Sequence, residues 1–363
     1  MANKNISPKI TWDFGTAYEL FVSLHVLDEA EFFGIRPAYA AGVRSRIPAP
    51  ERKLLEEVFS ITGVPLKWLS KLPAPKDAIS ALWALKQIPA AERLIKLYGA
   101  DEPQTDEKHQ KFNETILRIT SEGKWNNEDV EFFLKQFHKK HGKIKREAIE
   151  SFLNWVSKPE ELGEGFLSAM QAYYQAFFEE EEKRVEPVLR AGLERAISLQ
   201  SQLSFEELFL ELSQGIQLSD EFLAPKFIIA PAFWTTPLIF FDRIDKDTML
   251  LMFGARPADM SVIPGESVPD ALVRSLKALA DPTRLKILFY LSKESLTPSE
   301  IARRLQLRPP TVTHHLRELR LASLVEFSID DENNRYTVRK QALDAVYNQL
   351  NSFLEKEPEK ELT

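Results

Sequence analysis

The most regular pattern of apolar and polar positions lies in the last quarter of the chain, between residues 269 and 354. Leucines at three- and four-residue spacing predict a helix over residues 269–280. Asp281-Pro282 then supplies a cap and a first-turn proline for a second helix, and Thr297-Pro-Ser-Glu300 is a capping box that begins a third. A fourth helix is predicted to begin at Pro309-Pro310, directly after a short turn.

After the fourth helix the apolar period changes from that of a helix to that of a strand. Apolar residues alternate with polar ones over 325–329 and again over 335–339, and the acidic and amide residues 330–334 turn the chain between them. A long apolar stripe over residues 343–354 then predicts a last helix. Two short helices joined by a tight turn and followed by a hairpin are the elements of a winged helix-turn-helix, which places its second helix in the DNA major groove.

Residues 1–256 have a different pattern, in which prolines separate roughly eight to ten amphipathic helices. Ser204-Phe-Glu-Glu207 fits another capping box. Short apolar runs at 227–230, 238–241 and 248–253 predict a small sheet of two or three strands. The predicted fold class is therefore mainly α, with a multi-helical N-terminal domain that carries a small β-sheet and a C-terminal winged helix-turn-helix.

Amino-acid composition also supports a division of the chain into two domains near residue 266. All six Trp and 21 of the 24 Phe precede residue 266, and the segment from Pro257 to Pro269 holds three prolines, its two ends included. We expect a regulatory, ligand-binding or dimerisation domain over 1–256, a linker over 257–268, the winged helix-turn-helix over 269–354 and a charged tail over 355–363. The N-terminus does not resemble a signal peptide and no apolar run approaches the roughly 18 residues of a membrane helix, so we expect no membrane association and a cytoplasmic location.

Charge is distributed unevenly along the chain. The whole sequence carries a formal net charge of −7, but residues 269–340 hold 13 Lys and Arg against 9 Asp and Glu. A local basic surface matters more for attraction to phosphates than the global sum. The net acidity therefore does not exclude DNA binding by the C-terminal part.

Helical geometry indicates which side of helix 309–321 faces the groove. At about 100° per residue, Val312, Leu316 and Leu319 share one narrow sector and face the core, and His315 falls beside that sector, where packing or a local hydrogen bond is expected. Arginine can bond guanine through two hydrogen bonds, and threonine can reach a base edge or a phosphate. Outward residues of this helix, its N-terminal flank and the return strand of the wing are the candidate DNA contacts: Arg308, Pro310, Thr311, Thr313, His314, Arg317 and Arg335.

Three segments carry a resemblance to a known family: Leu279-Ala-Asp-Pro-Thr-Arg-Leu-Lys-Ile-Leu288, Ile301-Ala-Arg-Arg-Leu305 and Thr311-Val-Thr-His-His-Leu-Arg-Glu-Leu319. They resemble the ArsR family of bacterial winged-helix regulators over about residues 269–354. The resemblance implies a homodimeric repressor whose first and last helices pair and whose fourth helix reads the operator, with Thr313 and His314 at positions that usually meet DNA. Residues 1–256 are less informative. Within them, residues 18–27 resemble an uncharacterised N-terminal domain that is attached to ArsR-like modules.

The sequence also departs from the pattern of that family. The chain has no cysteine, so the cysteine pair that senses metals in some members is absent, and the last helix has no histidine for the other common metal site. We therefore expect no metal. Ser323 stands where the pattern usually has glycine, and the acidic wing tip leaves Arg335 as the best phosphate contact of the wing.

The apolar stripe of the last helix has two interpretations, a dimer contact or packing on its own domain. If it is a dimer contact, the candidate residues are Leu272, Leu276, Leu343, Val346, Tyr347, Leu350 and Phe353. The aromatic residues before 266 likewise form either a large core or an apolar effector pocket near Trp234, Phe240 and Phe241. No Gly-rich phosphate loop, nucleophile elbow or HExxH motif is present, so we expect no catalytic site and no cofactor.

The leading hypothesis is a homodimeric transcriptional repressor that binds double-stranded DNA through helix 309–321. Its N-terminal domain would tune operator affinity through a small apolar effector, a partner protein or dimer geometry. In the alternative, the N-terminal domain is an enzyme or small-molecule carrier and the winged helix serves autoregulation. A protein–protein scaffold, or a helix-turn-helix retained for protein contacts, remains a third possibility.

Overall fold

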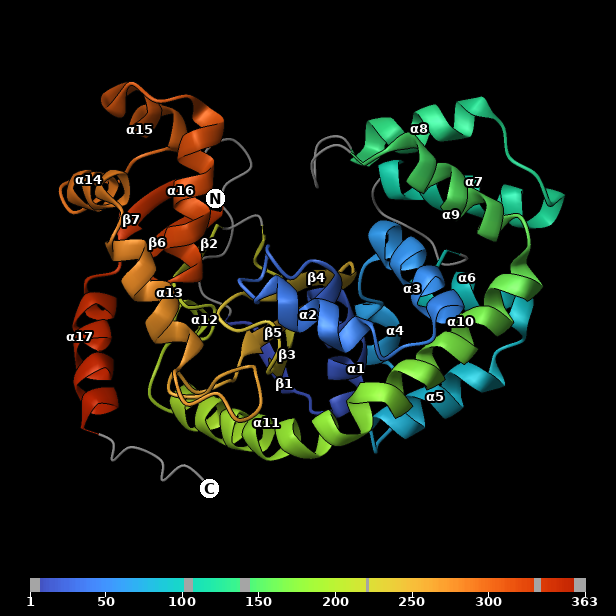
Figure 1. Cartoon of the computed structure of the whole chain (residues 1–363), viewed down its shortest axis with the longest axis horizontal. Coiled ribbons are helices and arrows are strands. Elements are labelled where there is room, and N and C mark those ends of the chain that lie inside the picture. The colour runs from blue at the N-terminus through green and yellow to red at the C-terminus, as the bar shows by residue number, and fades with distance from the viewer. Residues whose placement is uncertain (1–6, 101–106, 138–143, 220–221, 330–333, 356–363) are drawn as a thin grey trace. The chain divides into compact units, whose positions relative to one another are not determined.

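The computed structural model describes residues 7–100, 107–137, 144–219, 222–329 and 334–355. The structure is mainly helical with two small sheets, which confirms the predicted fold class (Figure 1). Backbone contacts group residues 13–187 and 242–250 into one unit, termed the helical unit, and residues 1–12, 188–241 and 251–363 into a second, termed the mixed unit. None of the described helices is long and apolar enough to cross a membrane.

The helical unit is built around α1 (Thr16–Asp28), which is buried over nearly its whole circumference. Aromatic rings surround this helix, with Phe21 against Phe59 and Trp68 at centroid distances of 6.5 and 6.1 Å. The other helices are α2 (Pro37–Arg44), α3 (Ala49–Thr62), α4 (Leu66–Ser70), α5 (Ala78–Gln87), η1 (Ala90–Glu92), α6 (Arg93–Tyr98), α7 (Glu107–Glu122), α8 (Asn127–Phe137), α9 (Arg146–Val156), α10 (Pro159–Tyr173) and the π-helical turn η2 (Tyr174–Phe178).

The number of helices expected from the proline breaks was too low. In the described residues, twelve α-helices precede β2, the last two being α11 (Glu179–Gln200) and α12 (Phe205–Leu212). The short helices α4 and α6 have only five and six residues, too few to show a helical period in the sequence. The capping box predicted at Ser204 is present and begins α12.

A four-stranded sheet has the order β1-β3-β5-β4, where β1 is Lys9–Trp12, β3 is Lys226–Ala232, β4 is Phe240–Asp245 and β5 is Thr248–Gly254. The last three strands were predicted. The fourth, β1, was not, because a strand of four residues that pairs in parallel with β3, from Lys9 opposite Lys226 to Trp12 opposite Ile229, has no local sequence pattern. Within the mixed unit, α12 packs on β3 through Phe205 and Phe227, whose rings lie 4.7 Å apart.

The C-terminal part of the mixed unit, termed the head, has the element order of a winged helix-turn-helix. It consists of α13 (Asp270–Leu279), α14 (Pro282–Leu291), α15 (Pro298–Leu305), α16 (Pro309–Leu321), β6 (Val325–Ile329), β7 (Arg335–Val338) and α17 (Lys340–Leu354). Every element predicted over this part of the chain is confirmed. The wing hairpin pairs Val325 with Val338 and Phe327 with Tyr336, and Tyr336 also bridges to Leu296.

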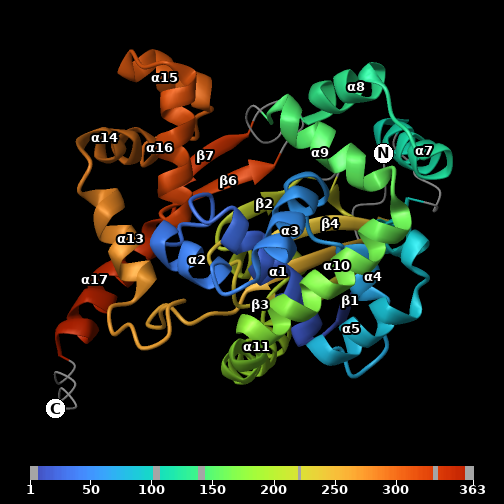
Figure 2. The same cartoon turned by 45° about the vertical axis from the view of Figure 1, so that its right-hand side comes forward.

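A third strand joins the wing. β2 (Ile216–Leu218) runs parallel to β6, with Ile216 opposite Phe327, so that the second sheet has the order β2-β6-β7 (Figure 2). The partner strand lies more than one hundred residues earlier in the chain and was not predicted. The wing is therefore not a free hairpin in this protein.

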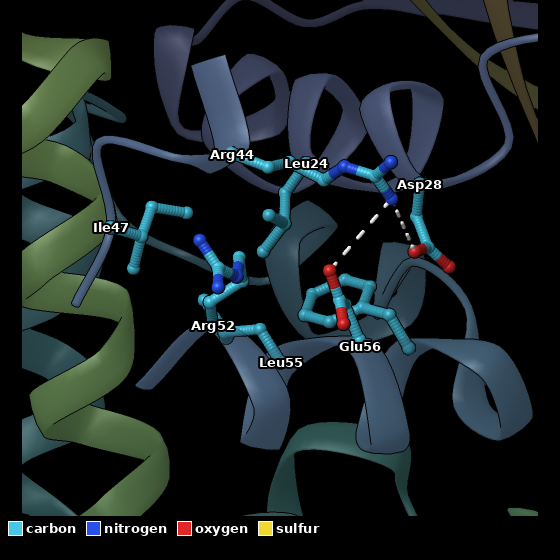
Figure 3. A pocket seen from close by; sticks show the side chains of 8 residues that line it. Leu24, Asp28, Arg44, Ile47, Arg52, Leu55 and Glu56 are labelled. Carbon is cyan, nitrogen blue, oxygen red and sulfur yellow. Dashed lines mark hydrogen bonds and ion pairs between the residues drawn. The ribbon is translucent and has the colours of Figure 1, made fainter. Parts of the chain in front are cut away.

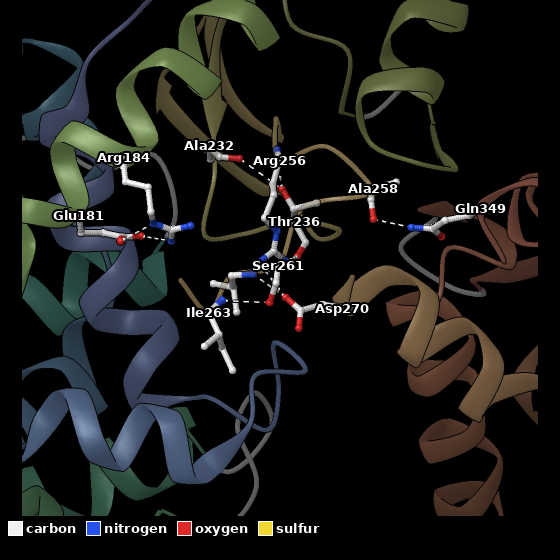
Figure 4. Close-up of polar contacts among 11 residues, drawn as sticks. Glu181, Arg184, Ala232, Thr236, Arg256, Ala258, Ser261, Ile263, Asp270 and Gln349 are labelled. Carbon is white, nitrogen blue, oxygen red and sulfur yellow. Dashed lines mark hydrogen bonds and ion pairs between the residues drawn. The ribbon is translucent and has the colours of Figure 1, made fainter. Parts of the chain in front are cut away.

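A buried ion pair fixes the segment between the four-stranded sheet and the head. Asp270 Oδ2, at the start of α13, accepts hydrogen bonds from Arg256 Nη1 at 3.3 Å and from the amide of Val262 at 2.6 Å (Figure 4). Arg256 Nη2 also donates to the carbonyl of Thr236 at 3.0 Å. Both charged side chains are buried, with exposed fractions of 1% and 10%. The segment 257–268 thus has a defined path, and its role as a domain boundary stays a prediction.

Candidate nucleic-acid interface

The helix-turn-helix is formed by α15 and α16, and local hydrogen bonds fix both the start and the end of α15. The Thr297 side chain accepts from the amide of Glu300, and the Glu300 carboxylate accepts from the amide of Thr297 at 2.8 Å. These bonds hold the pKa of Glu300 below its usual value. The helix ends at Gln306, whose φ of 55° turns the chain towards α16.

The two faces of α16 differ in burial as predicted. Val312, Leu316 and Leu319 are at most 1% exposed, which confirms that this side faces the core. The five candidate DNA contacts between Arg308 and His314 are all exposed, namely Arg308, Pro310, Thr311, Thr313 and His314. Because these side chains lie opposite the core, α16 presents a polar surface to solvent.

Arg317 is half-buried, so less of it is available than of the other outward residues. Its Nη2 lies 3.3 Å from Glu318 Oε1. A base contact by Arg317 would have to compete with this neighbouring carboxylate. The hydroxyl of Thr313 is also engaged, since it donates to the carbonyl of Pro309 at 3.1 Å, but its oxygen can still accept a hydrogen bond.

His315 lies on the edge of the core side. Burial lowers the pKa of its imidazole, and the negative charge of Asp281 opposes this shift. Asp281 caps α14 by accepting from the amide of Arg284 at 2.9 Å. His315 is therefore placed for packing within the head rather than for an outward contact.

Arg335 lies on β7 and is exposed, but the head itself already engages its guanidinium. Nη2 donates to the carbonyl of Ser295 and lies 3.4 Å from Glu300 Oε2. Glu300 lies in the first turn of α15, and Ser295 precedes the N-cap of that helix by two residues. Its role as the phosphate contact of the wing stays a prediction.

Arg320 has a structural role that the sequence did not indicate. Its guanidinium lies over the ring of Phe327, 4.1 Å from the centroid, so α16 is fixed against β6. Burial lowers the pKa of this guanidinium. The spacing from Arg320 to Phe327 crosses a helix end and a turn, and no periodic pattern connects the two residues.

Comparison with known proteins agrees with this geometry. Residues 281–326 match the model of the bacterial regulatory proteins of the arsR family. An uncharacterised HTH-type transcriptional regulator of Methanocaldococcus jannaschii is 41% identical over 64 residues, which cover 18% of this chain and 67% of that protein. The transcriptional repressor SdpR of Bacillus subtilis is 30% identical over 80 residues, or 22% of this chain and 89% of that protein. The chain belongs to the ArsR family.

Among solved structures, the crystal structure of NolR from Sinorhizobium fredii is similar to this ArsR-family chain at 29% identity. The match covers 24% of this chain and 83% of that chain, with a TM-score of 0.20. The residues that match the family model, 281–326, lie in the head. The two relatives share about a fifth of this chain.

The candidate dimerisation residues of this ArsR-family protein fall into two groups. Leu272 and Val346 are 2% and 8% exposed and are buried where α13 and α17 pack on one another within the same chain. Leu276, Leu343 and Tyr347 are 40%, 37% and 66% exposed, while Leu350 and Phe353 are half-buried. The sequence could not separate the groups, because both lie on one apolar stripe.

The residues proposed for an apolar effector pocket lie among core contacts. Trp234 is fully buried. Phe241 packs against Phe209 and Phe227 at centroid distances of 5.6 and 6.3 Å, and Phe240 is half-buried. These contacts are those expected of a hydrophobic core, the other interpretation of the aromatic composition.

A small cavity in the helical unit combines apolar walls with charged groups (Figure 3). Arg44 Nη1 lies 3.4 Å from Asp28 Oδ1 and 3.9 Å from Glu56 Oε1 at its rim. Burial raises the pKa of Asp28 to about 6, although Arg44 opposes the shift. A cavity with a perturbed acid is a feature of an enzyme, but its volume of about 10 Å³ is room for roughly one water molecule and not for a substrate.

Proposed function

We propose that this ArsR-family protein is a homodimeric, DNA-binding transcriptional repressor that reads its operator through α16. The main support is the outward face of α16, where Thr311, Thr313 and His314 are exposed opposite a buried apolar side. That arrangement is the one a recognition helix needs to enter a major groove. The name of SdpR, a transcriptional repressor, favours repression over activation.

The dimer of this proposal would use the exposed row of Leu276, Leu343 and Tyr347 on α13 and α17. Two heads related by a twofold axis would then present two copies of α16 to two half-sites. The residues before the head would tune operator affinity. A ligand there must bind the DNA-competent and incompetent states with different affinity in order to shift them.

Fluorescence anisotropy of the full-length protein tests the proposal. The probe is the DNA upstream of its own gene, compared with a scrambled duplex at several salt concentrations. Tight binding to the native duplex alone, weakening steeply with salt, is the expected result, because a specific complex releases counterions from the phosphates it contacts. Equal and weak binding to both duplexes would contradict the proposed function, in which the protein reads an operator upstream of its own gene.

A further inference from the structure

Two residues in the left-handed region of backbone space meet where the head joins the rest of the mixed unit. Gln214, between α12 and β2, has a φ of 55°, and Ser323, between α16 and β6, has a φ of 54°. The hydroxyl of Ser323 donates to Oε1 of Gln214 at 2.7 Å. Two backbone turns far apart in the sequence are thus joined by one side-chain hydrogen bond.

This contact explains why Ser323 departs from the family pattern. A positive φ favours glycine, which has no Cβ to clash with the backbone, so glycine is the expected residue at this turn. Serine is strained there but has a hydroxyl that glycine lacks. In this chain the hydroxyl reaches Gln214, a residue outside the part of the chain that matches the family model.

The backbone that follows Gln214 is also hydrogen-bonded to the wing. The amide of Phe327 donates to the carbonyl of Gly215 at 2.9 Å, and β2 pairs with β6 over the next three residues. Gly215 has a φ of 111°, and a Cβ added there would lie 3.1 Å from Glu326 Cγ and 3.2 Å from the carbonyl oxygen of Val325. A Cβ at residue 215 would require these neighbours to shift by a few tenths of an ångström, and a side chain is also strained at this φ.

On its other side, β2 is tied to the four-stranded sheet. It follows α12 directly, and Phe209 of α12 packs on Phe227 and Phe241 of that sheet. An ion pair of 3.5 Å between Glu211 and Arg339 lies alongside, at a partly exposed position where it adds little. The wing is therefore linked to the sheet through α12 and β2.

We infer that residues 211–218 are a positioning segment for the wing, a role that rests on the proposed DNA binding. The wing begins only three residues after α16 ends, so its orientation determines which phosphates beside the operator half-site it can reach. In this protein β2 and the Ser323–Gln214 hydrogen bond set that orientation. Releasing β2 would leave α16 in its groove and remove the contacts of the wing to the flanking DNA.

Gly215→Ala in the full-length protein tests the inference, with Gly265→Ala as the matched control. Both glycines have a positive φ, but a Cβ at Gly265 meets nothing within 4 Å. We expect Gly215→Ala to speed hydrogen exchange at the Phe327 amide and to weaken operator binding about three- to tenfold, the equivalent of roughly one lost hydrogen bond. Hydroxyl-radical footprints should lose protection at the flanks and keep it at the centre of each half-site, whereas Gly265→Ala should match the wild type.

Operator binding by the wild type distinguishes a failure of this inference from a failure of the proposed function. A wild-type protein that does not discriminate the operator overturns both. If the wild type discriminates, unchanged affinity and footprint of Gly215→Ala despite faster Phe327 exchange overturn the inference alone.

Should Gly215→Ala not fold, Ser323→Ala and Gln214→Ala decide the question, because alanine keeps a Cβ at each strained position. A double variant that binds DNA no more weakly than either single variant supports the inference, since the two residues then act through one bond. Additive losses overturn it.

Discussion

At the residue scale, whether a single side chain is available to contact DNA depends on neighbours that sequence periodicity does not reveal. Periodicity correctly assigned Val312, Leu316 and Leu319 to the core, because one helix is enough to define that face. It could not show that Arg335 is held by Ser295 and Glu300, since those contacts require the folded head.

Arg317→Ala is expected to weaken specific operator binding by about 1–3 kcal/mol if Arg317 reads a base. The same substitution should change binding to a scrambled duplex much less, because a base contact depends on sequence. Anisotropy titrations on both duplexes measure the difference. Lys293→Ala, at an exposed cation just after the end of α14, is the control. An equal loss for Arg317→Ala on both duplexes would make Arg317 a phosphate contact instead.

Asp28 gives a pH-dependent prediction for the helical unit. Its pKa of about 6 in the folded protein lies above the ordinary value of 3.8 for an aspartate, so the folded state retains a proton that the unfolded state releases. The contribution of Asp28 to stability therefore falls as the pH rises from about 4 to 6 and stays low above that range. The free energy of unfolding of Asp28→Asn, measured relative to that of the wild type, should therefore rise by about 2–3 kcal/mol between pH 4 and pH 7.

Urea unfolding at the two pH values measures this gain. Glu31→Gln, which removes an exposed charge that is not among those shifting the pKa of Asp28, is the matched control. A constant difference in unfolding free energy between Asp28→Asn and the wild type at both pH values would contradict the raised pKa.

At the scale of elements, local chemistry defined the helices of the head closely. Caps and first-turn prolines predicted the starts of α14, α15 and α16, and all three begin where expected. The strands β1 and β2 were missed, because strands of four and three residues have little pattern of their own and depend on distant partners.

Thr297→Ala tests the importance of the cap on α15. Loss of the capping box should cost about 1 kcal/mol of unfolding free energy, within a range of roughly 0.5–2 kcal/mol. It should also weaken operator binding, because α15 supports α16. Denaturant unfolding and anisotropy measure the two effects.

The control for Thr297→Ala is Asp77→Ala, which removes a helix cap in the helical unit. Asp77 caps α5 by accepting from the amide of Ser80 at 2.7 Å, so its loss should have a similar effect on stability. Operator affinity should remain at the wild-type value. Equal losses of affinity in the two variants would mean that Thr297 acts only through general stability.

At the scale of the whole molecule, the exposed row on α13 and α17 predicts the oligomeric state. Tyr347→Asp should shift the proposed dimer towards monomer by about 2 kcal/mol or more, as expected when a charge replaces a large aromatic residue at the centre of an interface. Analytical ultracentrifugation over a concentration series measures the shift. Asn348→Asp adds the same charge at the next exposed position of α17 and should leave the distribution unchanged. A monomer at all concentrations of the wild type would remove the dimer from the proposed function.

The third strand of the wing also has a consequence for the solubility of the head when it is separated from the rest of the chain. A fragment of residues 269–354 would lack β2, and the amide of Phe327 would lose the carbonyl of Gly215 as its acceptor. An uncovered strand edge of this kind is a template for pairing with another chain. Cutting out the head is therefore expected to produce an aggregation-prone fragment, because the edge of its wing is covered by a strand from outside it.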